Sequence, residues 1–432
     1  MLKIAFIGAG STIFAKNVLG DCMMTPALAE AHIALHDIDL ARLKESETML
    51  NNLNRNNGSK ATIKAYADRR EALRGATYVV NAITAGAFEP FIRGDHEIPR
   101  KYGLKQTYAD TLGIGGLFRA LRTIGPMLDF ARDMEELCPD AWFLNYTNPM
   151  AILTGALLRG TGIKAVGLCH SVQVCAKELL EGLGMNAEGV HWRIAGINHQ
   201  AWLLDITRDG EDLYPEIKRR AAARPGPHDD MVRYEIMNTF GSYVTESSMH
   251  GAEYMPYFIK NAYPELLERY NIPTENYKGW GNSRQEYWDR VMRELVNDVS
   301  IVHVRTHEYA SYIMEAMETN TPFKIAGNVL NTGGLISNLP EEACVEVPCL
   351  VDANGVTPTR FGPLPQQLAA LNRTNINMQL LAVEAALTRK REYIYHAALL
   401  DPHTSAELPI DKIKALVDEM LEANGDMLPA YL

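Results

Sequence analysis

The stretch Leu2–Ser11 (LKIAFIGAGS) predicts how the chain begins to fold. Its apolar run Ile4–Ile7 is typical of a buried strand, and the glycine-rich residues that follow predict a tight turn into a helix. Glycines at such a turn let the backbone approach a phosphate, and the amino terminus of the next helix points at that anion. We therefore expect a dinucleotide pyrophosphate to be bound by Gly8, Gly10, Ser11 and Thr12.

This glycine turn departs from the usual dinucleotide motif at one position, because Ile13 stands where a third glycine is expected. Asp37, at the end of the next β-rich run, supports the same interpretation. A carboxylate there can hold the adenosine ribose hydroxyls, and it favours NAD over the 2′-phosphorylated form. The alternative is a strand turn that binds no nucleotide.

Strands and helices are predicted to alternate over the first 195 residues. Five further β-rich runs are His32–His36, Thr62–Tyr66, Tyr78–Ile83, Ala141–Tyr146 and Lys164–Leu168. Helical patterns between them include Leu40–Asn51 and Leu117–Leu137, the second interrupted by Pro126. This alternation predicts an α/β fold with an N-terminal Rossmann-like parallel sheet, and ligands bind such sheets at the carboxyl ends of the strands.

The pattern changes after Ile194, where helical segments dominate. They are Met231–Phe240, Arg284–Val296, His307–Met317, Gln366–Thr388 and Ile410–Ala423, with extended runs at Lys324–Asn331 and Ala343–Val351. The stretch Arg219–Asp230 (RRAAARPGPHDD) predicts a mobile surface loop. We expect two domains, a Rossmann-like domain of residues 1–195 and an α+β domain of residues 196–432.

Composition excludes several classes of protein. The chain has 432 residues, of which 47% are hydrophobic, and a net charge of −11 from 42 basic and 53 acidic side chains. This acidic balance, without a block of Lys or Arg, argues against a nucleic-acid or membrane-surface partner. No apolar run approaches the ~18 residues of a spanning helix, and six cysteines are too few for a disulfide scaffold. We expect a soluble, reduced, cytoplasmic protein.

A cysteine and two histidines follow predicted strands. Cys169 and His170 come directly after Lys164–Leu168, and His199 ends the short run Gly196–His199. A thiolate and an imidazole from two strand ends can hold a divalent metal and leave positions open for substrate oxygens. The alternatives are an inert buried thiol and histidines that are only hydrogen-bonded.

Two further segments end at expected strand tips. Asn145–Met150 (NYTNPM) places amide groups where they can contact sugar or nicotinamide hydroxyls, and Pro149 suits the first turn of a helix. Tyr108–Gly116 (YADTLGIGG) is a glycine-rich loop with one acid, Asp110, ahead of a helix. From the local pattern alone, function and ordinary loop chemistry explain this second segment equally well.

These segments, in this order, resemble glycoside hydrolase family 4, the NAD- and metal-dependent glycosidases. The resemblance covers essentially the whole chain and is nearest to bacterial α-galactosidases of the melibiase type. Its motifs are FIGAGSTIFAKNVLGD (6–21), ADTLGIGGLFRALRTI (109–124), PDAWFLNYTNPMA (139–151), VGLCHSV (166–172), AGINH (195–199), ALNRTNIN (370–377) and DPHTSAEL (401–408).

The resemblance implies a role for each matching residue. Cys169 and His199 would bind the metal, usually Mn²⁺, and Asn148 would contact the substrate. His170 would protonate the leaving oxygen. These roles place substrate and metal binding, together with oligomer contacts, partly in residues 196–432.

The base that removes a proton from the sugar is less well defined by the resemblance. Asp110 would lie beside this base and raise its basicity. The region that would supply the base is Ser247–Tyr254 (SSMHGAEY), in which Tyr254 and His250 are both candidates. Of the two, Tyr254 is the expected base.

The family mechanism implies that the sugar is oxidised at C3, loses its leaving group by C1–C2 elimination, takes up water and is reduced again. NAD is then a resident cofactor that is not consumed, and no pair of catalytic carboxylates is needed. Relatives that act on phosphorylated sugars have an arginine near position 92, where this chain has Ile92 followed by Arg93, so we expect an unphosphorylated α-galactoside of the melibiose or raffinose type.

Other activities remain open at this stage. Within the family they are α-galacturonidase, α-glucuronidase and α-glucosidase. Outside it they are a lactate/malate-type NAD-dependent dehydrogenase, which would share the fold, and a non-enzymatic NAD-sensing module. The resemblance also implies a homodimer or homotetramer.

Overall fold

The computed structural model describes residues 2–86, 90–306 and 308–432. Six strands of the first half form a parallel sheet in the order β3-β2-β1-β4-β5-β6. They are β1 (Lys3–Ile7), β2 (His32–His36), β3 (Thr62–Tyr66), β4 (Tyr78–Asn81), β5 (Trp142–Asn145) and β6 (Lys164–Gly167). Every predicted strand of this half is present, and the predicted α/β fold with a Rossmann-like parallel sheet is confirmed.

Helices follow the strands of this half. They are α1 (Thr12–Met24), α2 (Leu40–Asn56), α3 (Arg69–Leu73), α5 (Gly113–Leu137), α6 (Met150–Gly160) and α7 (His170–Gly182), with a π-helix η1 (Pro90–Glu97) leading into α4 (Ile98–Lys101). The expected interruption at Pro126 is wrong, because α5 continues through it. Pro126 lies on the exposed face, whereas Met127 and Leu128 are buried and hold the helix against the core.

One sheet continues from the first half into the second. Its strands there are β7 (Val190–Ile197), β8 (Gln200–Arg208), β10 (Tyr243–Val244), β11 (Phe323–Leu330) and β12 (Cys344–Asp352), with β9 (Glu211–Asp212) and β13 (Gly355–Pro358) at its margins. β11 pairs antiparallel with β6 where Asn328 lies opposite Gly167. The predicted α+β character of this half is thus built onto the edge of the parallel sheet, and the division at residue 195 stays a prediction.

The second half of the chain also contains helices. They are α8 (Tyr214–Ala223), α9 (Met231–Phe240), α10 (Ser248–Glu253), α11 (Glu265–Arg269), α12 (Tyr277–Asn297), α13 (Tyr309–Thr319), α14 (Gln366–Thr388), α15 (Glu392–Leu400), α16 (Pro402–Glu407) and α17 (Ile410–Asn424), with a 3₁₀ turn η2 (Gly425–Met427) after α17. The first residue predicted for α13, His307, lies outside the described residues.

The predicted loop Arg219–Asp230 is partly wrong, because its first five residues belong to α8. Tyr214, Ile217 and Ala221 are buried on one face of this helix. Helical spacing of these three residues fixes the segment to the core, and the exposed arginines between them hid this pattern in the sequence.

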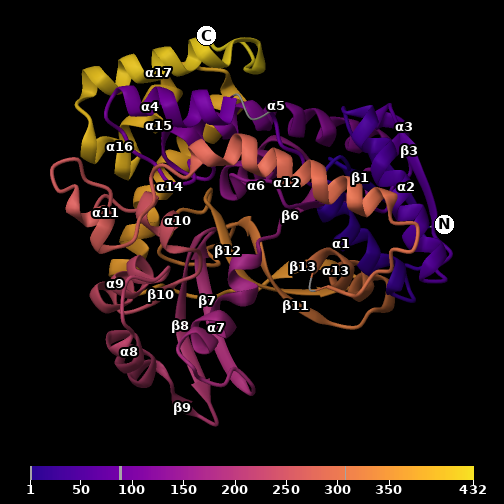
Figure 1. Cartoon of the computed structure of the whole chain (residues 1–432), viewed down its shortest axis with the longest axis horizontal. Coiled ribbons are helices and arrows are strands. Elements are labelled where there is room, and N and C mark those ends of the chain that lie inside the picture. The colour runs from indigo at the N-terminus through magenta and orange to yellow at the C-terminus, as the bar shows by residue number, and fades with distance from the viewer. Residues whose placement is uncertain (1, 87–89, 307) are drawn as a thin grey trace.

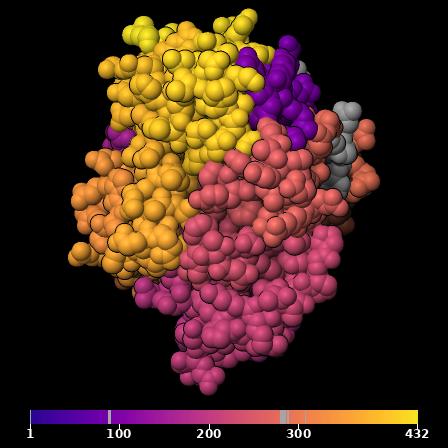
Figure 2. All heavy atoms as spheres, turned by 90° about the vertical axis from the view of Figure 1, so that its left-hand side faces the viewer, coloured from indigo at the N-terminus to yellow at the C-terminus, as the bar shows by residue number. Residues whose placement is uncertain are grey.

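The arrangement of the halves is visible in the figures. In Figure 1 the first strands and helices, from β1 to β3, lie on the right. The β7–β8 hairpin projects at the end opposite α17. Figure 2 shows the C-terminal helices in direct contact with the segment coloured magenta to salmon. One hydrophobic core runs through both halves, and a smaller one lies under α7, α8 and the hairpin. No described helix is long and apolar enough to cross a membrane.

Candidate active site

The glycine turn after β1 is packed too closely to accept a side chain. Gly8 has φ +92°, and a Cβ atom there would lie 2.7 Å from the carbonyl carbon of Ala82. A Cβ atom on Gly10 would lie 2.8 Å from Asp37 Oδ2. The turn therefore places bare backbone at the carboxyl end of β1, between β2 and β4.

The amino terminus of α1 directly follows the glycine turn. Ser11 is its N-cap residue and makes no side-chain cap hydrogen bond, so its side chain leaves the first-turn N–H groups unshielded. Thr12 is fully buried, and its Oγ1 lies 2.8 Å from Ser46 Oγ. The uncapped Ser11 side chain fits the pyrophosphate of a dinucleotide, whereas the buried Thr12 hydroxyl, paired with Ser46, supports the turn from behind.

Asp37 stands beside this turn. Its Oδ2 accepts a hydrogen bond from Gly10 N at 2.7 Å, and its Oδ1 accepts one from Asp39 N at 2.9 Å. A carboxylate has about four acceptor positions, so Asp37 retains acceptor capacity for ribose hydroxyls. Asp37 thus links the turn to the predicted ribose position.

Three side chains from distant segments converge on one point. Ligand atoms of Cys169, His199 and Glu246 all lie within 4.8 Å of one another. Cys169 precedes α7, His199 lies between β7 and β8, and Glu246 follows β10. The set of one sulfur, one nitrogen and one carboxylate oxygen fits a divalent metal ion, and the carboxylate supplies an oxygen ligand of the kind that Mn²⁺ prefers.

We call this set the metal cluster. Within it, the Cys169 thiol and the His199 ring each shift the pKa of the other toward its charged form. Burial acts to raise the pKa of the Cys169 thiol, but the adjacent His199 outweighs burial and lowers it. Burial acts to lower the pKa of His199, but Cys169 and Glu246 outweigh it and raise that pKa. Without a metal ion the cluster therefore pairs a Cys169 thiolate, the form that binds metals, with a protonated His199, and metal binding would displace the His199 proton. His199 Nδ1 is buried and has no hydrogen-bond partner among the described residues.

A histidine and a carboxylate lie next to the metal cluster. His250 and His199 have ring centroids 4.6 Å apart. His250 Nε2 lies 3.2 Å from Asp110 Oδ1, and its Nδ1 lies 3.0 Å from Ser247 Oγ. Although burial acts to raise the pKa of Asp110, its hydrogen bond with His250 lowers it, so the ionised carboxylate orients the ring through Nε2–H.

Tyr254 and His250, the two candidate bases, are both buried, and Tyr254 lies deeper. Its side chain is only 1% exposed, and its hydroxyl donates a hydrogen bond to the carbonyl oxygen of Asn198 at 3.0 Å. Burial raises its pKa well above the usual range. His250, the other candidate, is 8% exposed and differs from Tyr254 in that its ring is paired with the carboxylate of Asp110.

His170, at the first position of α7, is held by an acid. Its Nε2 lies 2.7 Å from Glu308 Oε2, and its side chain remains 47% exposed. The hydrogen bond to Glu308 raises the pKa of His170. A half-exposed imidazole whose pKa is raised by an adjacent carboxylate is suited to act as a general acid.

Asn148 precedes α6, at the carboxyl end of β5. Its Oδ1 accepts a hydrogen bond from Met150 N at 3.2 Å, and its side chain is partly exposed. Behind it, Asn81 Nδ2 donates to Asn145 Oδ1 at 2.9 Å and joins β4 to β5. Asn148 thus projects from a rigid edge of the sheet.

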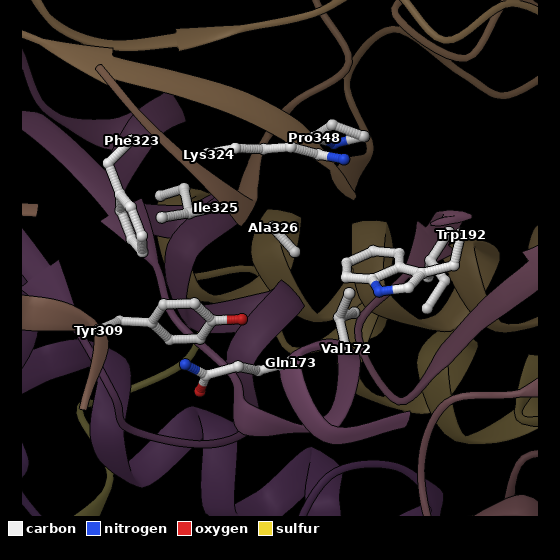
Figure 3. A pocket seen from close by; sticks show the side chains of 10 residues that line it. Val172, Gln173, Trp192, Tyr309, Phe323, Lys324, Ile325, Ala326 and Pro348 are labelled. Atoms are coloured by element: carbon white, nitrogen blue, oxygen red, sulfur yellow. The ribbon is translucent and has the colours of Figure 1, made fainter. Parts of the chain in front are cut away.

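A cavity of about 130 Å³ is lined by Tyr309 together with residues of α7, β7, β11 and β12 (Figure 3). The rings of His170 and Tyr309 stack with centroids 6.3 Å apart. The Tyr309 hydroxyl points into the cavity, near Gln173 and Ala326. One aromatic ring therefore forms both a wall of this cavity and a support for His170.

Two acidic residues of the site were not found from the sequence. Glu246 stands directly before Ser247–Tyr254, which was considered only as a source of the base. Glu308 comes after residues 301–306, which form neither helix nor strand, so no hydrophobic periodicity marks its position in the sequence. Neither residue carries a local pattern, because each acts on a partner that is far away in the sequence.

Two family profiles match successive parts of the chain. The profile described as "Family 4 glycosyl hydrolase" matches residues 3–185, and the profile described as "Family 4 glycosyl hydrolase C-terminal domain" matches residues 194–404. An α-galactosidase of Bacillus subtilis is 58% identical over 432 residues, the full length of both chains. An α-galactosidase of Rhizobium meliloti is 33% identical over 99% of this chain and 89% of its own.

A solved structure shows the same fold. The 6-phospho-α-glucosidase from gut microorganisms, crystallised in complex with NAD and Mn²⁺, matches with a TM-score of 0.84 over 100% of both chains at 21% identity. The likeness therefore extends over both halves of the sheet.

Proposed function

Because this chain belongs to glycoside hydrolase family 4, we propose that it is an α-galactosidase that requires bound NAD and Mn²⁺. Its substrates are terminal α-galactosides of the melibiose or raffinose type. The observation that carries the proposal is the meeting of Cys169, His199 and Glu246 beside the Asp110–His250 pair. In a lactate/malate-type dehydrogenase the Cys169 thiolate would have no chemical role. In a non-enzymatic NAD-sensing module the whole metal cluster would have none.

The two cofactors would supply hydride transfer to and from the sugar and polarisation of its C3 oxygen. The turn of Gly8, Gly10, Ser11 and Thr12, with Asp37, would hold NAD, and the metal cluster would hold the ion. Asn148 would orient the substrate. The chain's own side chains then have two tasks, which are to move a proton from C2 and to deliver one to the leaving oxygen.

His170 takes the second task in this proposal. Glu308 raises the pKa of its imidazole and so favours the protonated form, and the half-exposed ring would face the glycosidic oxygen. Protonation of that oxygen turns a poor leaving group into a neutral alcohol. Replacing His170 should therefore slow cleavage of sugar leaving groups far more than cleavage of p-nitrophenolate, which leaves without a proton.

His250 takes the first task, in place of Tyr254. Asp110 accepts from its Nε2–H and so leaves the lone pair on Nδ1, beside Ser247 Oγ. The ionised Asp110 also stabilises the imidazolium that forms when the ring takes a proton. A neutral phenol that donates to a backbone carbonyl, as Tyr254 does, has neither advantage.

The experiment that tests the function is a panel of p-nitrophenyl α-glycosides assayed with NAD⁺ and Mn²⁺. We expect the α-galactoside to be cleaved best, ahead of the galacturonide, glucuronide and glucoside, and 6-phosphorylated sugars to be poor because Ile92 replaces an arginine. Hydrolysis in D₂O should place deuterium at C2 of the released sugar. Product with only hydrogen at C2 would contradict the elimination route.

We also place the enzyme in the cytoplasm as a homodimer or homotetramer. NAD and a thiolate that must stay reduced both suit a reducing compartment, and all six cysteines are free. Light scattering on the purified chain would test the oligomeric state.

A further inference from the structure

The loop that carries Asp110 is held by one buried carboxyl group. Glu253 Oε1 accepts hydrogen bonds from Thr107 N at 2.6 Å and from Ala109 N at 3.0 Å. Glu253 is only 2% exposed. Buried backbone N–H groups need acceptors, and losing one costs about 1–3 kcal/mol. Glu253 thus fixes the two donors that flank Tyr108.

The residue directly before Asp110 is in a strained conformation. Ala109 has φ +53° and is fully buried. A non-glycine residue adopts this left-handed region only where its surroundings hold it there, at a cost of about 1–3 kcal/mol. The N–H of this strained residue is one of the two that Glu253 accepts, so the carboxyl group bears directly on the backbone that aims Asp110.

Glu253 and His250 lie on the same short helix, α10, at spacing i and i+3, which places them on one face. Thr107 Oγ1 adds a second tie between loop and helix, because it donates to the carbonyl oxygen of Met249 at 2.9 Å. The loop that supplies Asp110 and the helix that supplies His250 are therefore fastened together a few residues from the 3.2 Å contact between the two side chains.

We propose that Glu253 is a positioning residue for proton abstraction, holding the 107–110 loop so that Asp110 meets His250. The proposal rests on the assignment of His250 as the base. Glu253 acts through Asp110, and neither substrate nor cofactor needs to touch it.

The protonation behaviour of Glu253 suits this role. Burial raises the pKa of Glu253 to about 7, although the backbone donors act to lower it. Its Oε2 is buried without a hydrogen-bond partner among the described residues. Oε1 can accept from both N–H groups whether or not Oε2 carries a proton, so the loop is held without a permanent second charge beside Asp110.

The test compares Glu253→Ala with Glu253→Gln. The alanine variant loses the acceptor, and we expect kcat to fall about 10–100-fold, as for other supporting residues, with KM and the affinities for NAD and Mn²⁺ within about threefold of the parent. The glutamine variant keeps an oxygen for both N–H groups and should retain most of the activity.

The kinetic isotope effect at C2 separates positioning from general damage. With substrate deuterated at C2, Glu253→Ala should show a larger isotope effect on kcat than the parent, because proton abstraction becomes rate-limiting. The matched control is Asp21→Asn, at another buried carboxylate that accepts a backbone N–H, from Thr306. That variant should lose thermal stability and leave the isotope effect unchanged. An unchanged isotope effect in Glu253→Ala would overturn the proposal.

A double-mutant cycle with Asp110→Ala gives an independent outcome. If Glu253 acts through Asp110, removing Glu253 from an enzyme that lacks Asp110 should cost less than threefold in kcat. Equal costs in both backgrounds would overturn the proposal. If Glu253→Ala does not fold, Thr107→Val is the alternative variant, because it removes only the hydrogen bond from Thr107 Oγ1 to the Met249 carbonyl oxygen. It should raise the isotope effect with a smaller loss of kcat. An isotope effect equal to that of the parent would contradict the proposal.

His250→Gln distinguishes failure of this inference from failure of the assigned base. If that variant still incorporates deuterium at C2 from D₂O at the parental rate, the base itself is misassigned. If it does not, but Glu253→Ala behaves like the parent, only the role of Glu253 is wrong.

Discussion

The two cofactor positions proposed for this enzyme are built in opposite ways. The nucleotide turn comes from one continuous stretch, residues 8–12, with Asp37 at the tip of the adjacent strand. The metal cluster and the neighbouring Asp110–His250 pair come from five separate positions, at residues 110, 169, 199, 246 and 250. A local motif can be read from sequence, whereas a site assembled by tertiary folding depends on every element that brings its members together.

Removing the thiolate should break the metal cluster with the largest effect. Cys169→Ser replaces the soft ligand, so Mn²⁺-dependent turnover should fall by at least about 100-fold, while NAD affinity changes less than threefold because the glycine turn is untouched. Isothermal titration with each cofactor measures both. Cys175→Ser, at a buried thiol of α7 outside the cluster, is the matched control and should keep Mn²⁺-dependent activity. Loss of NAD affinity in Cys169→Ser would show that the two positions are not independent.

The reciprocal change should break the nucleotide turn alone. Gly8→Ala would place a methyl group 2.7 Å from the Ala82 backbone in a left-handed conformation. Strain of about 1–3 kcal/mol should weaken NAD binding about 10-fold or more and leave Mn²⁺ affinity unchanged. Gly58→Ala is the control, because Gly58 has φ +68° but no atom within 4 Å of its Cβ position. It should cost only about 1 kcal/mol of stability, and equal NAD affinity in the two variants would refute the packing argument.

A smaller effect should sharpen the composition of the metal cluster. Glu246→Gln keeps the shape of the side chain and removes its charge. We expect Mn²⁺ affinity to fall about 10-fold, less than for Cys169→Ser, with little change in NAD binding. Electron paramagnetic resonance of bound Mn²⁺ measures the affinity directly. An unaltered Mn²⁺ affinity would reduce the cluster to Cys169 and His199.

The smallest effect concerns the support of α1, the helix that begins at the nucleotide turn. Asp21 Oδ1 lies 2.7 Å from His303 Nε2 and accepts from Thr306 N at 2.7 Å. Burial acts to raise the pKa of Asp21, but these hydrogen bonds outweigh it and lower that pKa. A carboxyl with a lowered pKa contributes stability above its unfolded value of about 3.9 and loses it as the pH falls further.

Thermal unfolding from pH 6 to pH 3 measures this contribution. The parent should be more stable than Asp21→Asn at pH 6, by about 2 kcal/mol in the free energy of unfolding, and the difference should shrink as the pH approaches 3. A difference that does not depend on pH would show that the charge of Asp21 contributes nothing.

The same contrast explains what the sequence could predict. The six parallel strands and the turn around Gly8 follow from local hydrophobic periodicity and glycine chemistry, and both lie where they were expected. The family motifs placed Cys169 and His199 at strand ends, and the fold brings them together. Glu246 and Glu308 were missed because their partners are set by the crossing of distant strands. The choice between Tyr254 and His250 stays a prediction, because a sequence does not reveal that the tyrosine hydroxyl donates to the carbonyl oxygen of Asn198 whereas the histidine ring is paired with Asp110.

The Cys169–His199–Glu246 donor set has a consequence for metal selection in the cell. Sulfur, imidazole nitrogen and one carboxylate are the ligands that Zn²⁺ takes in tetrahedral sites, and the affinity of such sites for Zn²⁺ exceeds that for Mn²⁺. Occupancy by Mn²⁺ must then be set by the free concentrations of the two ions rather than by selectivity of the protein. Enzyme produced under zinc excess should accumulate with Zn²⁺ bound, and its activity should follow the ratio of free Mn²⁺ to free Zn²⁺ in the host cell.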